Sequence, residues 1–125
     1  MTNLPLIPLV DDSPVQRKLF AGALKANGYS VVVGENGREG VELALQHRPV
    51  LILMDLSMPE MDGLSATREL RTYPEMAQIP ILALTASTDP DELENALQAG
   101  YTDAIDKSGD RTLFLETIRQ WLTPI

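Results

Sequence analysis

The sequence contains no cysteine, which excludes disulfide bonds, thiolate nucleophiles and cysteine-ligated metal sites. It contains a single histidine, His47, so a metal site built from several histidines is excluded too, and we expect that side chain at a solvated helix end. Basic residues are also scarce: 10 Lys and Arg stand against 18 Asp and Glu, for a net charge of −8. This balance argues against direct binding to nucleic acid, which requires a basic surface.

Long apolar segments are absent as well. No run approaches the ~18 apolar residues of a membrane-spanning helix, and the N-terminus has no basic segment ahead of an apolar one, as a secretory signal would. We therefore expect no membrane partner and a cytoplasmic location. The composition, 44% hydrophobic and 22% charged, is typical of a globular protein, and we expect one domain over residues 1–125. The acidic balance favours a basic partner surface or a divalent cation.

Strand and helix patterns alternate five times along the chain. Helix starts are marked by the capping residues Ser13, Asn36 and Asp89, two of which precede a proline. Five such units with right-handed crossovers predict an α/β fold: a flavodoxin-like, doubly wound five-stranded parallel sheet of order 2-1-3-4-5 with five helices. Strands are expected over 6–10, 30–33, 50–54, 79–84 and 102–106, with helices beginning near residues 14, 37, 64, 90 and 110.

Three helices have apolar residues that we expect to face the sheet, and in the second helix these are Val41, Ala44 and Leu45. In the fourth helix these are Leu93, Ala96 and Leu97, and in the last helix Phe114, Ile118, Trp121 and Leu122.

Reactive side chains follow four of the predicted strands. Asp11 and Asp12 end the first, Asp55 the third, Thr85 the fourth and Lys107 the fifth. The carboxyl ends of parallel strands meet at one edge of the sheet, where open α/β folds place their binding crevice. Three clustered carboxylates repel one another and need a cation, and oxygen ligands alone favour Mg²⁺. The arrangement suits attack by a carboxylate on a phosphorus donor, with the ammonium and hydroxyl groups binding phosphoryl oxygens.

These residues lie in motifs that carry a family resemblance over essentially the whole chain. The motifs are residues 10–13 (VDDS), 54–63 (MDLSMPEMDG), 84–86 (LTA), 99–100 (AG) and Lys107. With them the chain resembles a response-regulator receiver domain of two-component signalling. The resemblance implies a signalling domain rather than an enzyme with a separate substrate, either a stand-alone regulator or part of a larger protein such as a hybrid histidine kinase.

The resemblance also implies roles for individual residues. Asp55 would accept a phosphoryl group from a histidine kinase or phosphotransfer domain. Asp12, Asp55 and the main-chain carbonyl of Ser57 would bind Mg²⁺, and Asp11 would act through a metal-bound water. Thr85 would move toward the phosphoryl group, and Lys107 would pair with Asp55. An output partner would bind the face formed by the fourth helix, fifth strand and fifth helix.

The sequence departs from the family pattern at two positions. Ala104 replaces the usual aromatic residue three positions before the lysine, so no ring can swing inward there. Ser108 replaces the proline that usually follows the lysine. In the family, the bond between the lysine and that proline is typically cis. A cis bond before a non-proline residue costs about 2.5–4 kcal/mol, so we expect a trans Lys107–Ser108 bond. We expect Gly109 to provide the turn through its freedom in φ, and Asp110 to cap the last helix.

Two other classes use a similar edge. A Mg²⁺-dependent phosphatase of the haloacid-dehalogenase type also has a nucleophilic aspartate, a Thr and a Lys. It would need an Asp-x-Asp pattern after the first strand, which Asp11, Asp12 and Ser13 do not supply. A flavin-binding flavodoxin would need a Ser/Thr-rich phosphate loop and stacking aromatics in place of acids. A P-loop for nucleotides is absent.

Overall fold

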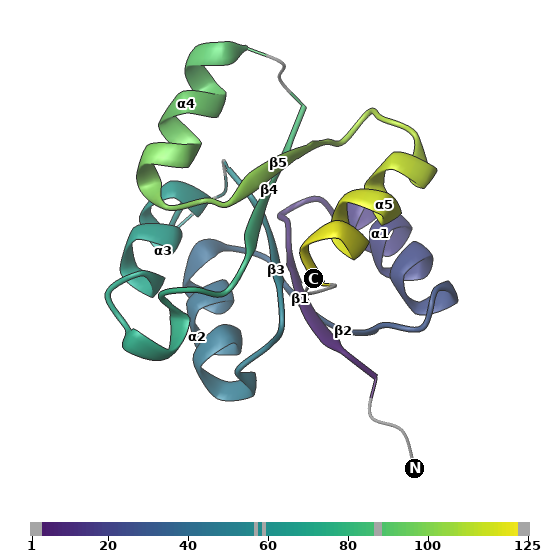
Figure 1. Cartoon of the computed structure of the whole chain (residues 1–125), viewed down its shortest axis with the longest axis horizontal. Helices are drawn as coiled ribbons and strands as arrows, with labels where there is room; N and C mark the ends of the chain where they lie inside the picture. Colours follow the sequence, from purple (N-terminus) through teal and green to yellow (C-terminus); the bar gives the residue numbers. More distant parts are fainter. Residues whose placement is uncertain (1–3, 57, 59, 87–88, 123–125) are drawn as a thin grey trace.

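The fold is a five-stranded parallel sheet between two layers of helices (Figure 1). The structure is a computed structural model that describes residues 4–56, 58, 60–86 and 89–122. The strand order is β2-β1-β3-β4-β5, as predicted. Ser57 and Pro59 lie outside the described residues. The strands are β1 (Leu6–Val10), β2 (Ser30–Gly34), β3 (Ile52–Asp55), β4 (Ile81–Thr85) and β5 (Asp103–Asp106). The helices are α1 (Pro14–Ala26), α2 (Gly37–His47), α3 (Gly63–Leu70), the short 3-10 helix η1 (Pro74–Met76), α4 (Pro90–Ala99) and α5 (Arg111–Leu122).

The sheet separates two hydrophobic clusters, because successive side chains of a strand point to opposite faces. On one face α2, α3 and α4 pack against alternate strand residues such as Val10, Ile52 and Met54. On the other face α1 and α5 pack against Leu9 and Leu53 and their neighbours. Figure 1 shows these two groups of helices on opposite sides of the sheet. None of the described helices is long and apolar enough to cross a membrane.

The predicted caps form as expected. The side chain of Ser13 accepts a hydrogen bond from Gln16 N at 3.3 Å, and that of Asn36 accepts one from Glu39 N at 2.9 Å. Asp89 accepts from Asp91 N at 3.0 Å, and Asp62 caps α3 in the same way. These side chains satisfy main-chain amides that have no partner within their own helix.

Helix α4 is rotated relative to the sequence prediction. Ala96 and Ala99 are buried, whereas Leu93 and Leu97 are each 43% exposed, so the prediction that both leucines face the sheet is wrong. The small alanine side chains let the helix axis approach its neighbours, and the leucines then lie beside the contact instead of inside it. The larger residues had suggested the opposite face.

Two further predictions are corrected. Trp121 does not face the core: it is 37% exposed, and its indole nitrogen donates to Asp103 Oδ2 at 3.1 Å, while Phe114 and Ile118 form the buried side of α5. The third strand begins at Ile52 and not at Val50, which lies before it and is 46% exposed.

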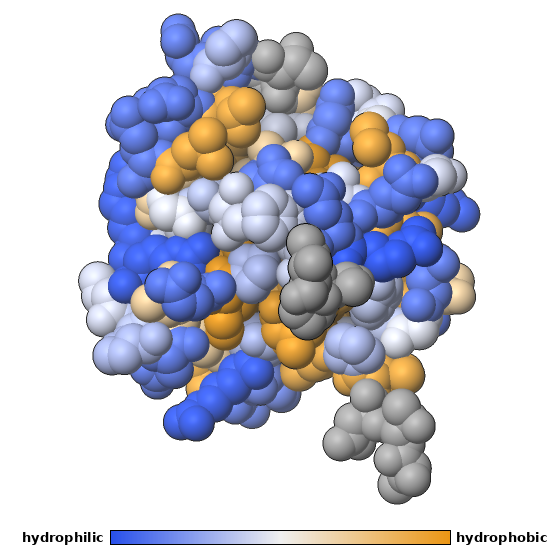
Figure 2. Space-filling model, in the orientation of Figure 1, coloured by the Kyte–Doolittle hydropathy of each residue, from blue (hydrophilic) through white to orange (hydrophobic). Residues whose placement is uncertain are grey.

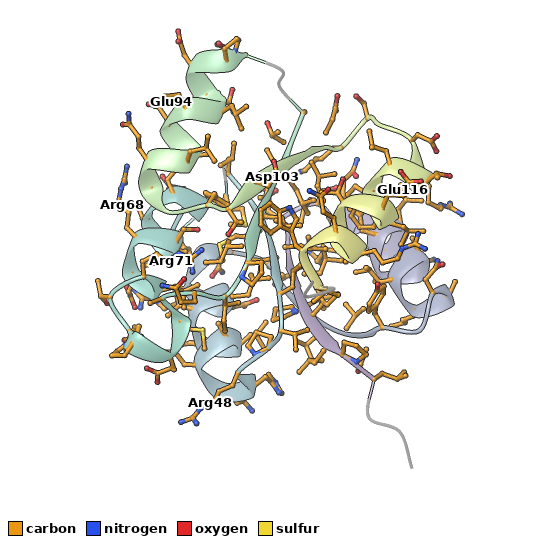
Figure 3. All side chains as sticks on the ribbon, viewed as in Figure 1. Arg48, Arg68, Arg71, Glu94, Asp103 and Glu116 are labelled. Carbon is orange, nitrogen blue, oxygen red and sulfur yellow. The ribbon has the colours of Figure 1, made fainter. Side chains whose placement is uncertain are left out.

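One partly buried arginine, Arg71, joins several elements of the fold. The Arg71 guanidinium donates to the carbonyl oxygens of Met76 at 2.6 Å, Ile79 at 2.8 Å and Gly100 at 2.9 Å. In Figure 3 the side chain of Arg71, which directly follows α3, lies against the body of the protein, whereas that of Arg68 on α3 points away from it. Arg71 therefore fixes α3 relative to the segments that lead into β4 and β5.

Candidate phosphoryl-acceptor site

The predicted residues do meet at the carboxyl edge of the sheet. Asp55 is the last residue of β3 and Thr85 the last of β4. Asp11 directly follows β1, and its amide donates to Gly34 O at 3.1 Å, which continues the ladder with β2. The amide of Lys107 donates to Thr85 O at 2.8 Å, which continues the ladder between β4 and β5. Strand register therefore fixes the main chain of Lys107, as the sequence predicted.

The Lys107 ammonium lies between two carboxylates. Its Nζ is 3.0 Å from Asp55 Oδ2, which confirms the prediction that this side chain points toward Asp55. Its Nζ also lies 2.9 Å from Asp11 Oδ2. This contact is an ion pair without the geometry of a hydrogen bond, and the sequence did not suggest it. Asp11 is fully buried and Asp55 is 8% exposed. Buried charges of this kind persist when they are paired.

The second oxygen of each buried carboxylate is held by the main chain. Asp11 Oδ1 accepts from Ser13 N at 3.0 Å, and Asp55 Oδ1 accepts from Leu56 N at 2.8 Å. These bonds fix the orientation of both carboxylates, so that one oxygen of each faces Lys107.

The electrostatics of the site reflect its burial. Desolvation raises the pKa of the Asp55 carboxyl above its ordinary value of 3.8, Asp11 raises it further, and Lys107 acts in the opposite direction. Burial alone would lower the pKa of the Lys107 ammonium, but its contacts with Asp11 and Asp55 outweigh that effect and raise it. At this edge one ammonium thus faces the carboxylates of Asp11, Asp12 and Asp55.

The residues present fit a hard divalent cation. Asp11, Asp12 and Asp55 each offer a carboxylate oxygen, and these oxygens lie within 4.8 Å of one another. Asp12 is exposed, so this cluster opens to solvent on one side. A set of oxygen donors with room for water is the donor set that Mg²⁺ prefers.

Two structural contacts at the site, made by Tyr101 and Gly63, could not be predicted from the sequence. The Tyr101 hydroxyl lies 3.1 Å from Asp55 O and 3.3 Å from Met54 O. A Cβ at Gly63 would collide with the Asp55 carbonyl oxygen and the Tyr101 hydroxyl. The signal for Tyr101 is its position just after the helix-ending Gly100, but nothing in the sequence indicates what its hydroxyl contacts.

The loop after Lys107 is only partly as predicted. The Lys107–Ser108 bond is trans, and Asp110 caps α5 by accepting from Thr112 N at 2.9 Å. Gly109, however, has no positive φ. The turn is held instead by the Asp106 carboxylate, which accepts from Ser108 N at 2.9 Å and from Ser108 Oγ at 2.7 Å. These bonds lower the pKa of Asp106.

Comparison with known proteins agrees with this geometry. A family model described as the response regulator receiver domain matches residues 7–119. The polar-differentiation response regulator DivK of Brucella anthropi is 37% identical over 116 residues, which cover 93% of this chain and 94% of that protein. Among solved structures, the chemotaxis protein CheY4 of Vibrio cholerae has a TM-score of 0.90 and 28% identity, with 96% of this chain and 100% of that chain covered.

A second solved structure bears on the acidic cluster. The receiver domain of the sensor histidine kinase PA1611 from Pseudomonas aeruginosa has a TM-score of 0.90 and 36% identity, with 96% of this chain and 98% of that chain covered. That structure has a magnesium ion coordinated in its active site cleft. Fold, site and comparisons together define a receiver domain of two-component signalling. The chain belongs to the response regulator receiver family.

Proposed function

We propose that the chain is a phosphoacceptor domain in which Asp55 receives a phosphoryl group from the phosphohistidine of a histidine kinase or phosphotransfer domain. The observation that carries this proposal is the Lys107 ammonium 3.0 Å from Asp55 Oδ2, at an edge where three carboxylates converge. A nucleophilic carboxylate with a fixed cation beside it is the arrangement that phosphoryl transfer requires.

In the transfer, a carboxylate oxygen of Asp55 forms a new P–O bond while the P–N bond of the donor phosphohistidine breaks. The electron pair of that bond goes to the departing imidazole. Asp55 is held for this attack by Leu56 N and Lys107. The Lys107 ammonium then has phosphoryl oxygens within reach and offsets their charge.

The proposed cofactor is Mg²⁺. Asp12 and Asp55 would bind it directly, Asp11 through a water, and the main-chain carbonyl of Ser57, which lies outside the described residues, would complete the protein ligands. When bound, Mg²⁺ supplies positive charge that offsets both the carboxylates and the incoming phosphoryl oxygens. Calorimetry on the Asp12→Ala variant tests the ligand assignment: Mg²⁺ affinity should fall, and an unchanged affinity would rule out Asp12 as a ligand.

The proposed output is a change in the face formed by α4, β5 and α5. Thr85 ends β4 between the acidic site and this face. If the Thr85 hydroxyl is drawn toward the phosphoryl group, the edge of this face that Thr85 forms would move with it. Ala104 on β5 has no ring to swing inward, so we expect the change in the main chain and in α4.

Incubation with acetyl phosphate and Mg²⁺, followed by intact-mass measurement, tests the function. The wild-type chain should gain one phosphoryl group and Asp55→Asn none. Glu42→Gln, which changes an exposed acid on α2, serves as the control and should be labelled like the wild type. Equal labelling of Asp55→Asn and wild type would overturn the assignment.

A further inference from the structure

The peptide unit that joins Asp55 to Leu56 is held at both of its polar ends. Its carbonyl oxygen, Asp55 O, accepts a hydrogen bond from the Tyr101 hydroxyl at 3.1 Å. Its N–H, which belongs to Leu56, donates to Asp55 Oδ1 at 2.8 Å. A peptide unit is planar, so a rotation that moves its carbonyl oxygen moves its N–H as well. The Tyr101 hydroxyl is therefore linked through one rigid plane to the Asp55 carboxylate.

Tyr101 brings this hydroxyl to β3 from a separate part of the fold. Its amide donates to Ala96 O at 3.1 Å, and the amide of the next residue, Thr102, donates to Ile81 O at 2.7 Å. The residue is only 4% exposed, and Figure 2 shows hydrophilic residues over most of this side of the molecule, with hydrophobic residues in patches between them. Because the ring is buried and its main chain is fixed, the hydroxyl has a defined place at the end of β3.

The main chain of α3 approaches the same peptide unit closely. A Cβ at Gly63 would collide with both the Asp55 carbonyl oxygen and the Tyr101 hydroxyl. The amide of Gly63 donates to Leu56 O at 2.9 Å, which holds the next peptide unit too. The Tyr101 hydroxyl lies 3.3 Å from Met54 O, the more distant of its two main-chain acceptors. Main-chain atoms on both sides of Asp55 are thus held in place.

We propose that Tyr101 is a positioning residue for phosphoryl transfer, which acts through the Asp55–Leu56 peptide unit on the orientation of the Asp55 carboxylate. The inference rests on the proposed function, in which Asp55 is the nucleophile. With Oδ1 bound by Leu56 N, Oδ2 faces Lys107. If the Leu56 N–H turned away, the carboxylate could rotate about its Cβ–Cγ bond and would hold the geometry for attack less of the time. Successive hydrogen bonds also polarise one another, so the hydroxyl on the carbonyl makes this N–H a stronger donor.

The test compares Tyr101→Phe with the wild type in time courses of labelling by acetyl phosphate, followed by intact mass at saturating Mg²⁺. The substitution keeps the ring and removes only the hydroxyl. The maximal rate constant should fall at least about fivefold, since misplacing a reacting group by about 1 Å costs up to ~10²-fold. The half-saturating concentration of acetyl phosphate should stay near the wild-type value, because Tyr101 is buried away from the donor. Saturating Mg²⁺ keeps metal occupancy equal in the two proteins.

Further measurements separate positioning from a loss of stability. In Tyr101→Phe the amide proton resonance of Leu56 should move upfield and its exchange with solvent should become faster, because this amide then bonds less well to the carboxylate. Ile7→Val is the matched control: it removes a buried carbon in the other hydrophobic cluster, near the amino end of β1, and should cause a similarly small loss of stability. It should keep the wild-type rate and the wild-type Leu56 resonance. Para-aminophenylalanine at position 101 supplies a donor again and should restore both.

Three outcomes would overturn the role of Tyr101. These are a maximal rate in Tyr101→Phe equal to that of the wild type, a Leu56 amide that does not respond to loss of the hydroxyl, and an equal loss of rate in Ile7→Val. If Asp55→Asn is labelled like the wild type, the proposed function falls and this inference falls with it. If Asp55→Asn is not labelled but Tyr101→Phe is labelled at the wild-type rate, the proposed function stands and only the role of Tyr101 falls.

Discussion

The Tyr101 hydroxyl donates to the main-chain carbonyl oxygen of Asp55 at 3.1 Å, which ties the segment before β5 to the end of β3. Tyr101 is buried, so Tyr101→Phe would leave a carbonyl without its donor at the residue proposed to accept phosphate. We expect a loss of about 1–2 kcal/mol in the free energy of unfolding, measured by urea denaturation. Stability equal to that of the wild type would show that this hydrogen bond contributes nothing.

The same tyrosine should make stability sensitive to alkaline pH. Burial raises the pKa of Tyr101 above its ordinary value of 10.0. At a pH between the ordinary pKa of the unfolded chain and the raised pKa of the folded chain, the unfolded chain has lost the phenol proton and the folded chain has kept it. The contribution of this group is therefore complete below pH 10 and is lost as pH rises toward the folded pKa. Unfolding measured in that range should show a steeper fall for wild type than for Tyr101→Phe; parallel curves would contradict the assignment.

Gly63 should tolerate no side chain. A Cβ there would collide with the Asp55 carbonyl oxygen and the Tyr101 hydroxyl, so Gly63→Ala must displace α3 from the end of β3. We expect a loss of about 1–3 kcal/mol in stability. Gly22→Ala is the matched control, since a Cβ on that exposed helical glycine meets nothing within 4 Å. It should stabilise by about 0.5–1 kcal/mol. Thermal unfolding that ranks the two variants the other way would refute this packing argument.

Lys107 should be needed for stability when metal is absent. In the wild type the Lys107 ammonium lies 2.9 Å from Asp11 Oδ2 and 3.0 Å from Asp55 Oδ2. In Lys107→Met the two buried carboxylates would face each other without this positive charge. Removing one partner of a buried ion pair typically costs about 3–5 kcal/mol. Mg²⁺ should therefore raise the melting temperature of Lys107→Met more than that of wild type. Lys18→Met, on the exposed side of α1, should behave like wild type in both conditions.

The sequence was sufficient to predict the sheet order and the edge at which the reactive residues meet. Both follow from strong local patterns: apolar runs for strands, caps and prolines for helix starts, and a topology that leaves few alternatives. The same logic predicted that Lys107 would reach Asp55, because strand register and not loop conformation places its main chain.

The errors concern properties that depend on tertiary packing. Leu93 and Leu97 were expected in the core, but the fit of Ala96 and Ala99 against neighbouring elements decided how α4 is rotated. Trp121 faces Asp103 because a partner for its indole N–H is available at the surface. The contact between Lys107 and Asp11 could not be read from spacing, because it depends on which oxygen of Asp11 is already held by Ser13 N.

In the proposed function Asp55, and neither neighbouring acid, carries the phosphoryl group. Borohydride reduction of the acetyl phosphate-treated protein converts an aspartyl phosphate to homoserine, and peptide sequencing by mass spectrometry then locates that residue. We expect homoserine at Asp55 alone, only when Mg²⁺ is present, and less of it in Lys107→Met. Homoserine at Asp11 or Asp12, or equal amounts at all three aspartates, would contradict the assignment of Asp55.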